Sequence, residues 1–312
     1  MTDYRKKGKL IYMLLFFFAV FVSMSGCSKV IDHTGSSSYE ITKLKNGYLL
    51  KGCSKVIVKN GIIYAADNYL EDSRSKGRLI SYQLDGYEIK EESLEVLLAD
   101  SVIDFVVSEN NNIYALALRG QKYIFYTNLD AVEKLYEDFP IEYRSDVRAI
   151  FYIQVDKNGN YYFGAGNKLY IMDQDLNEIS NLDGSTEGLV ALKNGRVACI
   201  IHSDANYLVK EIDEETFQPL KENKIKLTGT YTGNFKSGID YDFNYEADNC
   251  LYGYDFENGK AHLLFRLKKE AKTAASQIYP FGEQQYIMDT YSDNGDKVTV
   301  VITIKDSEDK GK

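Results

Sequence analysis

The chain of 312 residues is poor in several side chains on which protein chemistry often depends. It contains no tryptophan, three prolines, three histidines and four cysteines. With so few histidines, a histidine-based metal site or catalytic triad is not expected. The sequence also lacks the glycine-rich nucleotide-binding motifs, the H-E-x-x-H zinc motif and the G-x-S-x-G hydrolase motif. We therefore expect neither a cofactor nor a metal.

Basic residues are also scarce relative to acidic ones, with 37 Lys and Arg against 46 Asp and Glu and a net charge of −9. This balance argues against nucleic acid as a partner. The 44% hydrophobic and 27% charged residues are typical of a folded globular protein. Because the 26 tyrosines and 15 phenylalanines favour strands, we expect a mostly β structure.

The N-terminus has the layout of a secretory signal. Basic residues at positions 5–9 precede an uncharged, mostly apolar run at 10–22, which is shorter than the ~20 residues of a membrane span. The run is followed by Met24-Ser25-Gly26-Cys27, which resembles the bacterial lipobox, with Met24 where Leu is more common. The resemblance implies a diacylglycerol thioether on Cys27 and cleavage before it. The alternatives are an uncleaved anchor, or an ordinary signal in which the cysteine is incidental.

These features predict four segments. They are a lipoprotein signal peptide at 1–26, a flexible tether at 27–38, a folded domain at 39–305 and a disordered tail at 306–312. Cleavage before Cys27 would change the net charge from −9 to −12. More than one acyl chain on Cys27 would hold the protein on the extracellular face of the cell membrane, so the membrane is its first expected partner.

Three cysteines remain after Cys27, at positions 53, 199 and 250. An odd number with these wide spacings fits neither a disulfide framework nor a metal knuckle. We expect Cys53, Cys199 and Cys250 to be small buried apolar side chains. A single disulfide among them is the alternative, because the compartment would be oxidising.

The rest of the chain repeats one unit. An apolar alternation is followed by an Asn- or Gly-containing corner and then by a second strand, usually with Tyr near its start, at 56–64, 105–114, 153–162 and 189–198. Asn-Gly between alternating apolar runs predicts a tight hairpin. A second unit with an acidic turn follows, at 79–89, 169–179 and 251–260. The matched positions are Tyr64, Tyr114, Tyr162, Ala198 and Tyr286, with a degenerate copy near Asn249, and their mean spacing is about 44 residues.

Two hairpins per period give four strands, and a period of about 40–50 residues is typical of a β-propeller blade. The predicted fold is therefore an all-β propeller of about six, that is five to seven, four-stranded blades. A β-sandwich or an irregular β-solenoid is the alternative. The absence of tryptophan argues against the WD, kelch and sialidase-type repeats. Only residues 91–100 read as a short helix.

One stretch resembles a known family. Residues 238–245, Gly-Ile-Asp-Tyr-Asp-Phe-Asn-Tyr, followed by Leu-Tyr-Gly-Tyr-Asp at 251–255, are similar to the N-terminal propeller-like region of clostridial extracellular solute-binding lipoproteins. The resemblance implies a Gram-positive source and an association with ABC-type solute uptake. The solute-binding domain of that family would need two α/β lobes, which this chain lacks. A transporter component that has lost this domain is therefore a further hypothesis.

Acidic and aromatic residues supply the candidate site. Tyr231, Asp240, Tyr241, Asp242 and Tyr245 could contact a carbohydrate, a peptide or a protein partner, because tyrosine joins an apolar face to a polar tip. Asp240 and Asp242 could instead be a glycosidase-type carboxylate pair, or could simply be solvated. The Asp156-Lys157-Asn158-Gly159-Asn160 sequence is read as a turn rather than a calcium loop, because it lacks the later ligands.

The sequence thus predicts a non-enzymatic, membrane-anchored extracellular propeller that acts as a binding module. Its main alternative is a propeller enzyme that acts on extracellular glycan through carboxylates. Tyr64, Tyr114 and Tyr162, at the repeated position, are expected in the blade cores.

Overall fold

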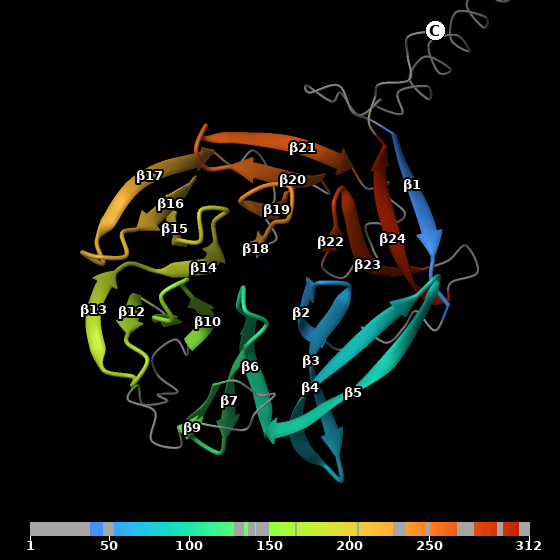
Figure 1. Ribbon diagram of the computed structural model, residues 1–312, viewed down its shortest axis with the longest axis horizontal. Helices are drawn as coiled ribbons and strands as arrows, with labels where there is room; N and C mark the ends of the chain where they lie inside the picture. The colour runs from blue at the N-terminus through green and yellow to red at the C-terminus, as the bar shows by residue number, and fades with distance from the viewer. Residues whose placement is uncertain are drawn as a thin grey trace, which may run out of the picture.

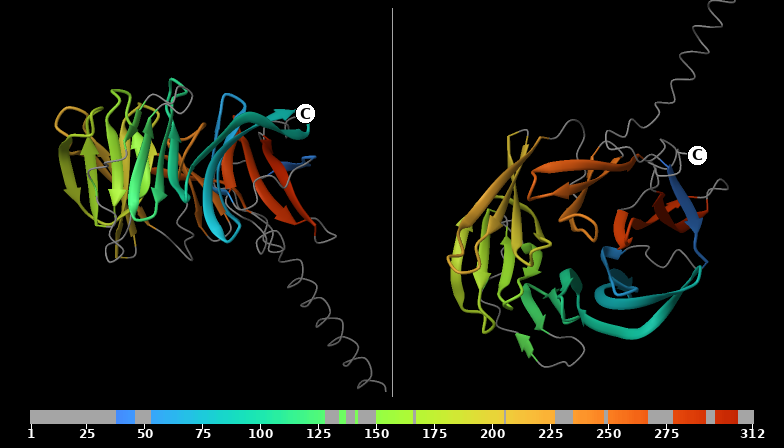
Figure 2. Two further views of the ribbon diagram at one scale, coloured as in Figure 1. Left: turned by 90° about the horizontal axis from the view of Figure 1, so that it is seen from below. Right: turned by 45° about the horizontal axis from the view of Figure 1, so that its top comes forward.

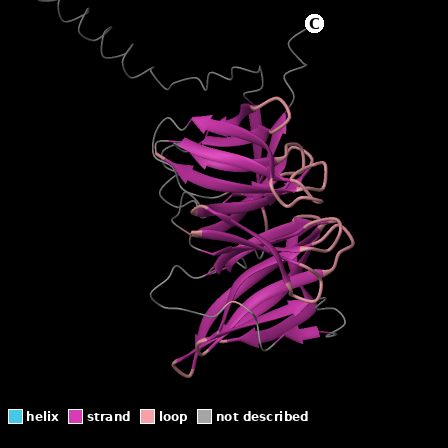
Figure 3. Ribbon diagram, turned by 90° about the vertical axis from the view of Figure 1, so that its left-hand side faces the viewer, coloured by secondary structure: helices cyan, strands magenta, loops and turns pink. Residues whose placement is uncertain are grey.

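The computed structural model describes residues 38–45, 53–127, 134–136, 141, 150–165, 167–204, 206–226, 235–247, 250–266, 278–291 and 296–305. Every regular element in these ranges is a β-strand, and the strands form six antiparallel sheets of four. The sheets stand around a common axis as the blades of a propeller (Figures 1 and 3). The predicted fold class and the blade number of six are confirmed.

Blades 1 to 5 each use four consecutive strands, which follow one another from the axis outward. Blade 1 is β2 (Cys53–Lys59), β3 (Ile62–Glu71), β4 (Arg74–Asp85) and β5 (Glu88–Ala99). Blade 2 is β6 (Ser101–Val107), β7 (Ile113–Arg119), β8 (Lys122–Thr127) and β9 (Lys134–Tyr136). Blade 3 is β10 (Ile150–Val155), β11 (Tyr161–Ala165), β12 (Lys168–Met172) and β13 (Glu178–Asp183).

Blade 4 is β14 (Thr186–Ala191), β15 (Val197–Ser203), β16 (Asn206–Ile212) and β17 (Pro219–Lys226). Blade 5 is β18 (Lys236–Ser237), β19 (Phe243–Ala247), β20 (Cys250–Asp255) and β21 (Lys260–Arg266). Blade 6 is β22 (Ile278–Gly282), β23 (Gln285–Tyr291), β24 (Lys297–Lys305) and, outermost, β1 (Ser38–Lys43).

Blade 6 closes the ring because it combines both ends of the described chain. β1 pairs antiparallel with β24, from Ser38 opposite Lys305 to Lys43 opposite Val300. Figures 1 and 2 show β1 beside β24 at the outer edge of the ring. Lys305 also pairs with Glu40 at 2.8 Å across this seam. The first strand therefore supplies the fourth strand of the last blade.

The hydrophobic core consists of six clusters, each between two consecutive blades. The cluster between blades 2 and 3 stacks Phe125 edge-on against Tyr161 and Phe163 at 5.0 and 5.3 Å. Between blades 4 and 5, Tyr207 lies edge-on to Phe235 at 5.3 Å. The other four clusters join blades 1 and 2, 3 and 4, 5 and 6, and 6 and 1. Apolar side chains buried between the facing sheets of neighbouring blades therefore hold the ring together.

The repeated tyrosines occupy these clusters as expected. Tyr162 is fully buried and Tyr64 is buried, whereas Tyr114 is partly buried against the cluster of blades 2 and 3. The predicted Asn-Gly hairpin is also present, since Asn60 and Gly61 both have positive φ, 52° and 77°. Residues 156–160 form a turn in which the Asp156 carboxylate accepts the backbone N–H of Asn158 and of Asn160, each at 2.9 Å.

Two local predictions are wrong. Residues 91–100 do not form a helix, because β5 runs through them from Glu88 to Ala99 and pairs with β4, for example Val96 with Leu79. The edge of an existing sheet overrides the weak helical preference of this segment. The inner hairpin of blade 5 turns at residues 238–242 rather than near Asn249, which lies outside the described residues.

Candidate functional site: the central channel

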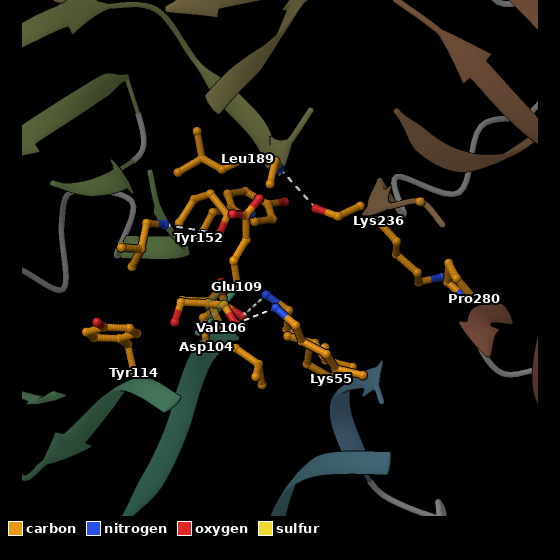
Figure 4. Close-up of a pocket in the computed structure, with 18 of the residues that line it drawn as sticks. Lys55, Asp104, Val106, Glu109, Tyr114, Tyr152, Leu189, Lys236 and Pro280 are labelled. Carbon is orange, nitrogen blue, oxygen red and sulfur yellow. Dashed lines mark hydrogen bonds and ion pairs between the residues drawn. The ribbon is translucent and has the colours of Figure 1, made fainter. Parts of the chain in front are cut away.

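The axis of the propeller contains a cavity of about 680 Å³. All six blades line it, because each presents its innermost strand to the axis. The lining includes Val56, Ile103, Tyr152, Leu189, Phe235 and Pro280, one from each blade or its inner turn. Figure 4 shows labelled lining side chains converging from several blades. A volume of this size lies within the range of ordinary ligand pockets, roughly 300–1,000 Å³.

A buried carboxylate holds three blades together beside this channel. Asp104 of β6 pairs with Lys55 of β2 at 2.7 Å and accepts the backbone N–H of Ile153 in β10 at 2.8 Å. It also accepts the N–H of Phe105 at 2.9 Å. The Asp104 side chain is 4% exposed, whereas that of Lys55 is 32% exposed toward the channel. Figure 4 shows the contact of Lys55 with Asp104.

A largely buried lysine lies on the opposite side of the channel. Lys236 of β18 pairs with Glu246 at 3.0 Å and donates to the carbonyl oxygen of Ile278 at 2.5 Å. Its ammonium also lies 4.6 Å from the ring centroid of Tyr279. Burial lowers the pKa of Lys236, and Glu246 opposes this shift. These contacts tie blade 5 to blade 6.

Aromatic side chains contribute to the apolar part of the lining. Tyr114, Tyr152, Phe235 and Tyr279 all line the cavity. Burial raises the pKa of Tyr152 to about 12, with Glu187 and Asp104 adding to the shift. Burial likewise raises the pKa of Tyr279. Both phenols are therefore neutral at physiological pH and can donate or accept hydrogen bonds.

The six inner hairpin turns lie at one mouth of the channel, since each follows an innermost strand of the same orientation. Adjacent turns are linked by hydrogen bonds. Asn60 Nδ2 donates to Asn111 Oδ1 at 2.9 Å, joining blades 1 and 2. The backbone N–H of Lys193 donates to Asp242 at 3.0 Å, and that of Gln284 donates to Asp240 at 2.8 Å. At this mouth, hydrogen bonds therefore link the inner turns of blades 1 and 2 and those of blades 4, 5 and 6.

The residues proposed from sequence fall into different environments. Asp240 and Asp242 lie in the inner turn of blade 5, and their carboxylates are engaged by the backbone of neighbouring segments. In addition to Lys193, Asp242 accepts the N–H of Phe256 at 2.8 Å. Neither carboxylate is among the residues that line the cavity. These two aspartates therefore fix the position of the turn in blade 5.

The predicted tyrosines are not brought together around a ligand space. Tyr241 packs over Gly253, where a Cβ atom would lie 2.2 Å from its ring, and it lies 5.4 Å from His262. Tyr245 is buried in the cluster of blades 4 and 5 and stacks on Tyr252 at 5.2 Å. Tyr231 and the proposed lipidation residue Cys27 lie outside the described residues.

The three later cysteines lie in three different blades. Cys199 and Cys250 are buried and Cys53 is half-buried. Burial raises the pKa of Cys199 to about 11 and, with Asp67 and Asp289 nearby, that of Cys53 to about 12. Such thiols are largely protonated at neutral pH and are weak nucleophiles.

The described residues contain neither a candidate metal cluster nor a membrane-spanning helix. No group of three or more His, Cys, Asp or Glu side chains in this part of the chain is placed to hold a metal ion. The same residues include no helix with the length and apolar character needed to cross a membrane.

Sequence reasoning missed the channel residues Lys55, Asp104, Tyr152 and Lys236. A usable signal was present, because each lies on or beside an inner strand at a position that alternation directs toward the axis or a neighbouring blade. The repeats located these strands, but which side chains of neighbouring blades contact one another is known only once the ring is assembled.

The comparisons with known proteins agree with this architecture. No protein-family model and no curated protein matches the chain. Among solved structures, virginiamycin B lyase from Staphylococcus aureus, as an inactive variant with quinupristin, is 14% identical, with 88% of this chain and 90% of that chain covered and a TM-score of 0.50. A luciferin-regenerating enzyme is 10% identical, with 86% and 97% covered and a TM-score of 0.52.

An auxiliary nutrient binding protein from Bacteroides thetaiotaomicron is also 10% identical, with 80% of this chain and 68% of that chain covered and a TM-score of 0.51. At these identities the likeness shows the fold alone. The three neighbours include two enzymes and one binding protein, so the shared fold leaves the choice between catalysis and binding open.

Proposed function

We propose that this protein is a ligand-binding module whose site is the central channel, and that it is held by a lipid on Cys27 at the extracellular face of a bacterial membrane. The observation that carries the binding role is the cavity of about 680 Å³, which combines charged, amide and aromatic side chains from six blades. Rigid blades would hold these groups in place before the ligand arrives, which lowers the entropic cost of binding.

Binding is favoured over hydrolysis by the state of the acidic groups in the lining. Asp104 is paired with Lys55, and Asp156 accepts hydrogen bonds from its own turn and from Tyr162 at 3.1 Å. A glycosidase of the usual type needs two carboxyl groups about 5 to 9.5 Å apart with distinct acid and base roles. Of the acids in the lining, Glu109 is the one without such an assigned structural contact among the described residues.

The binding role can be tested with a variant that fills the channel. Ala191 lines the cavity, whereas Ala261 is exposed on the outer strand β21, so Ala191→Trp and Ala261→Trp are a matched pair. The soluble form from residue 28 would be melted with a panel of neutral and acidic sugars and short peptides. A ligand that binds the native state raises the melting temperature. We expect the shift to vanish in Ala191→Trp and to persist in Ala261→Trp, and equal shifts in the two would refute a channel site.

The anchoring role has a separate test. Full-length protein would be produced in a Gram-positive host that is fed a radiolabelled fatty acid. We expect label and membrane association in the wild type and loss of both in Cys27→Ala. Label retained in Cys27→Ala would refute the proposed lipidation site. We also propose, from the resemblance to solute-binding lipoproteins, that the module works beside ABC-type solute uptake.

A further inference from the structure

Three inner turns carry the same tripeptide, Lys-Asn-Gly, at residues 59–61, 157–159 and 193–195. They belong to blades 1, 3 and 4, and each connects an innermost strand to the second strand of its blade. Lys59, Lys157 and Lys193 therefore lie at the same mouth of the channel, and all three line the cavity. Glycine supplies the positive φ of these tight turns, but the turn geometry does not require a lysine.

The turns of adjacent blades converge at this mouth. A Cβ atom on Gly195 would lie 3.4 Å from the Cδ of Lys157 and 3.8 Å from an oxygen of Glu109. The inner turns of blades 2, 3 and 4 therefore approach one another closely, with room at Gly195 for little more than a methyl group. Blade 1 belongs to the same group, because Lys59 donates to the carbonyl oxygen of Ser108 and Asn60 donates to Asn111, both in blade 2.

The lysines differ in how their charge is compensated. Lys157 pairs with Glu214 at 2.9 Å. In contrast, the described residues hydrogen-bonded to Lys59 and Lys193 offer neutral acceptors, the backbone carbonyl oxygens of Ser108 and Asp240. An ammonium group has three donors, so each of these two lysines retains donors beyond its carbonyl contact.

This arrangement is unusual for a chain with a net charge of −9. The overall charge does not attract anions, so an anion would be favoured by short-range contacts with these two ammonium groups, of which Lys59 is half-buried and Lys193 is exposed. Burial lowers the pKa of Lys59 and the charge of Glu109 opposes this shift. Hydrogen bonds from Asn258 lower the pKa of Asp255, to which Lys193 adds only a smaller effect of charge. The ammonium groups therefore keep donors for a ligand.

The deeper lining suits the uncharged part of the same ligand. Tyr152 and Phe235 line the cavity below the mouth and offer apolar ring faces. The channel thus has a cationic entrance and an aromatic interior.

We propose that the channel selects ligands that carry a carboxylate, and that Lys59 and Lys193, in the inner turns of blades 1 and 4, each offer a cationic contact for such a group at the mouth. The proposal rests on the proposed function, because it names the ligand class of the same channel. It extends that function by assigning the charge of the ligand, its orientation and two specificity-determining residues.

The test uses ligand pairs that differ in charge but little in shape. D-galacturonic acid would be compared with D-galactose, and N-acetyl-dialanine with its C-terminal amide, by calorimetric titration of the soluble form from residue 28. A charge-assisted hydrogen bond to a mouth lysine predicts about tenfold preference for the acid member of a pair. The preference should fall as salt is added, because exposed charges are screened.

Variants assign the preference to the two lysines. Lys59→Met and Lys193→Met keep an unbranched side chain but remove the charge, and each should reduce the preference. Lys59→Arg and Lys193→Arg should retain it, which also covers the case in which a methionine variant does not fold. Lys224→Met, on the exposed outer strand β17, is the matched control and should behave as the wild type.

The outcomes separate the two proposals. If neutral and acidic members bind equally and Ala191→Trp abolishes both, the channel is a binding site but carboxylate selection is refuted. If the preference exists but survives in both methionine variants, the assignment to Lys59 and Lys193 is refuted. If a panel ligand binds and Ala191→Trp leaves its binding unchanged, the proposed channel function itself fails.

Discussion

Replacing Asp104 by alanine tests whether the ring depends on polar contacts as well as on apolar burial. The substitution removes the partner of Lys55 and the acceptor of two backbone N–H groups, those of Phe105 and Ile153. Removing one member of a buried ion pair typically costs about 3–5 kcal/mol. Because Lys55 is 32% exposed and its ammonium can be rehydrated from the channel, we expect a value near the lower end, ~3 kcal/mol.

Urea unfolding at neutral pH, followed by circular dichroism, measures this loss. Asp104→Asn retains the size of the side chain and one carbonyl oxygen, so its cost should be smaller, about 1–2 kcal/mol. Glu40→Ala is the matched control, because Glu40 and Lys305 form a pair of similar length, 2.8 Å, with both side chains more than half exposed. The control should change the unfolding midpoint little. If Asp104→Ala moved the midpoint no more than Glu40→Ala, the role assigned to this carboxylate would be refuted.

Three further predictions concern close packing, acid stability and closure of the ring. A Cβ atom at Gly77 would lie 2.4 Å from the backbone nitrogen of Val102. Gly77→Ala should therefore force blades 1 and 2 apart and lower the free energy of unfolding in urea by about 1–3 kcal/mol. An unchanged free energy of unfolding would contradict this close approach of the two backbones. Hydrogen bonds from the Asn177 side chain and backbone hold the pKa of Asp173 below its ordinary value of 3.8. The ionised Asp173 therefore contributes stability above pH 3.8, and this contribution is lost as the pH falls through the lower folded pKa. Asp173→Asn should flatten the acid side of a plot of melting temperature against pH. A form that starts at residue 44 lacks β1, so its melting temperature should fall and it should self-associate through the uncovered edge of β24. Gel filtration would show the association. A monomer with an unchanged melting temperature would contradict the role of β1 in closing the ring.

The sequence predicted the architecture well because the repeat is a local signal. Asn60-Gly61 determines a hairpin from its own backbone preferences, and similar corners recur at regular spacing. Segment 91–100 was misread for the opposite reason, since its state depends on pairing with β4 rather than on its own composition. Blade 5 was placed wrongly because its inner strand has only two residues, Lys236 and Ser237, which is too short to show alternation.

The candidate site was harder to predict because its residues are distant in sequence. Lys55, Asp104 and Ile153 meet only when three blades are assembled, at separations of about one repeat each. Asp242 was predicted to contact a ligand because it is an acidic residue beside tyrosines. Its carboxylate instead accepts hydrogen bonds from the backbone N–H groups of Lys193 and Phe256. Local composition cannot distinguish these two uses of a carboxylate.

The shared sixth blade also determines the order in which the molecule can be made. The seam joins Ser38 to Lys305, 267 positions further along the chain, so the first strand to emerge during synthesis has no partner until β24 exists. Such a distant pairing is entropically costly to form and slows folding. Blades 1 to 5 can assemble one after another as the chain appears, but the ring stays open with two unpaired strand edges until β24 is made. Until then the open ring exposes strand edges to proteases and to other chains, so the speed of closure would set how much protein survives.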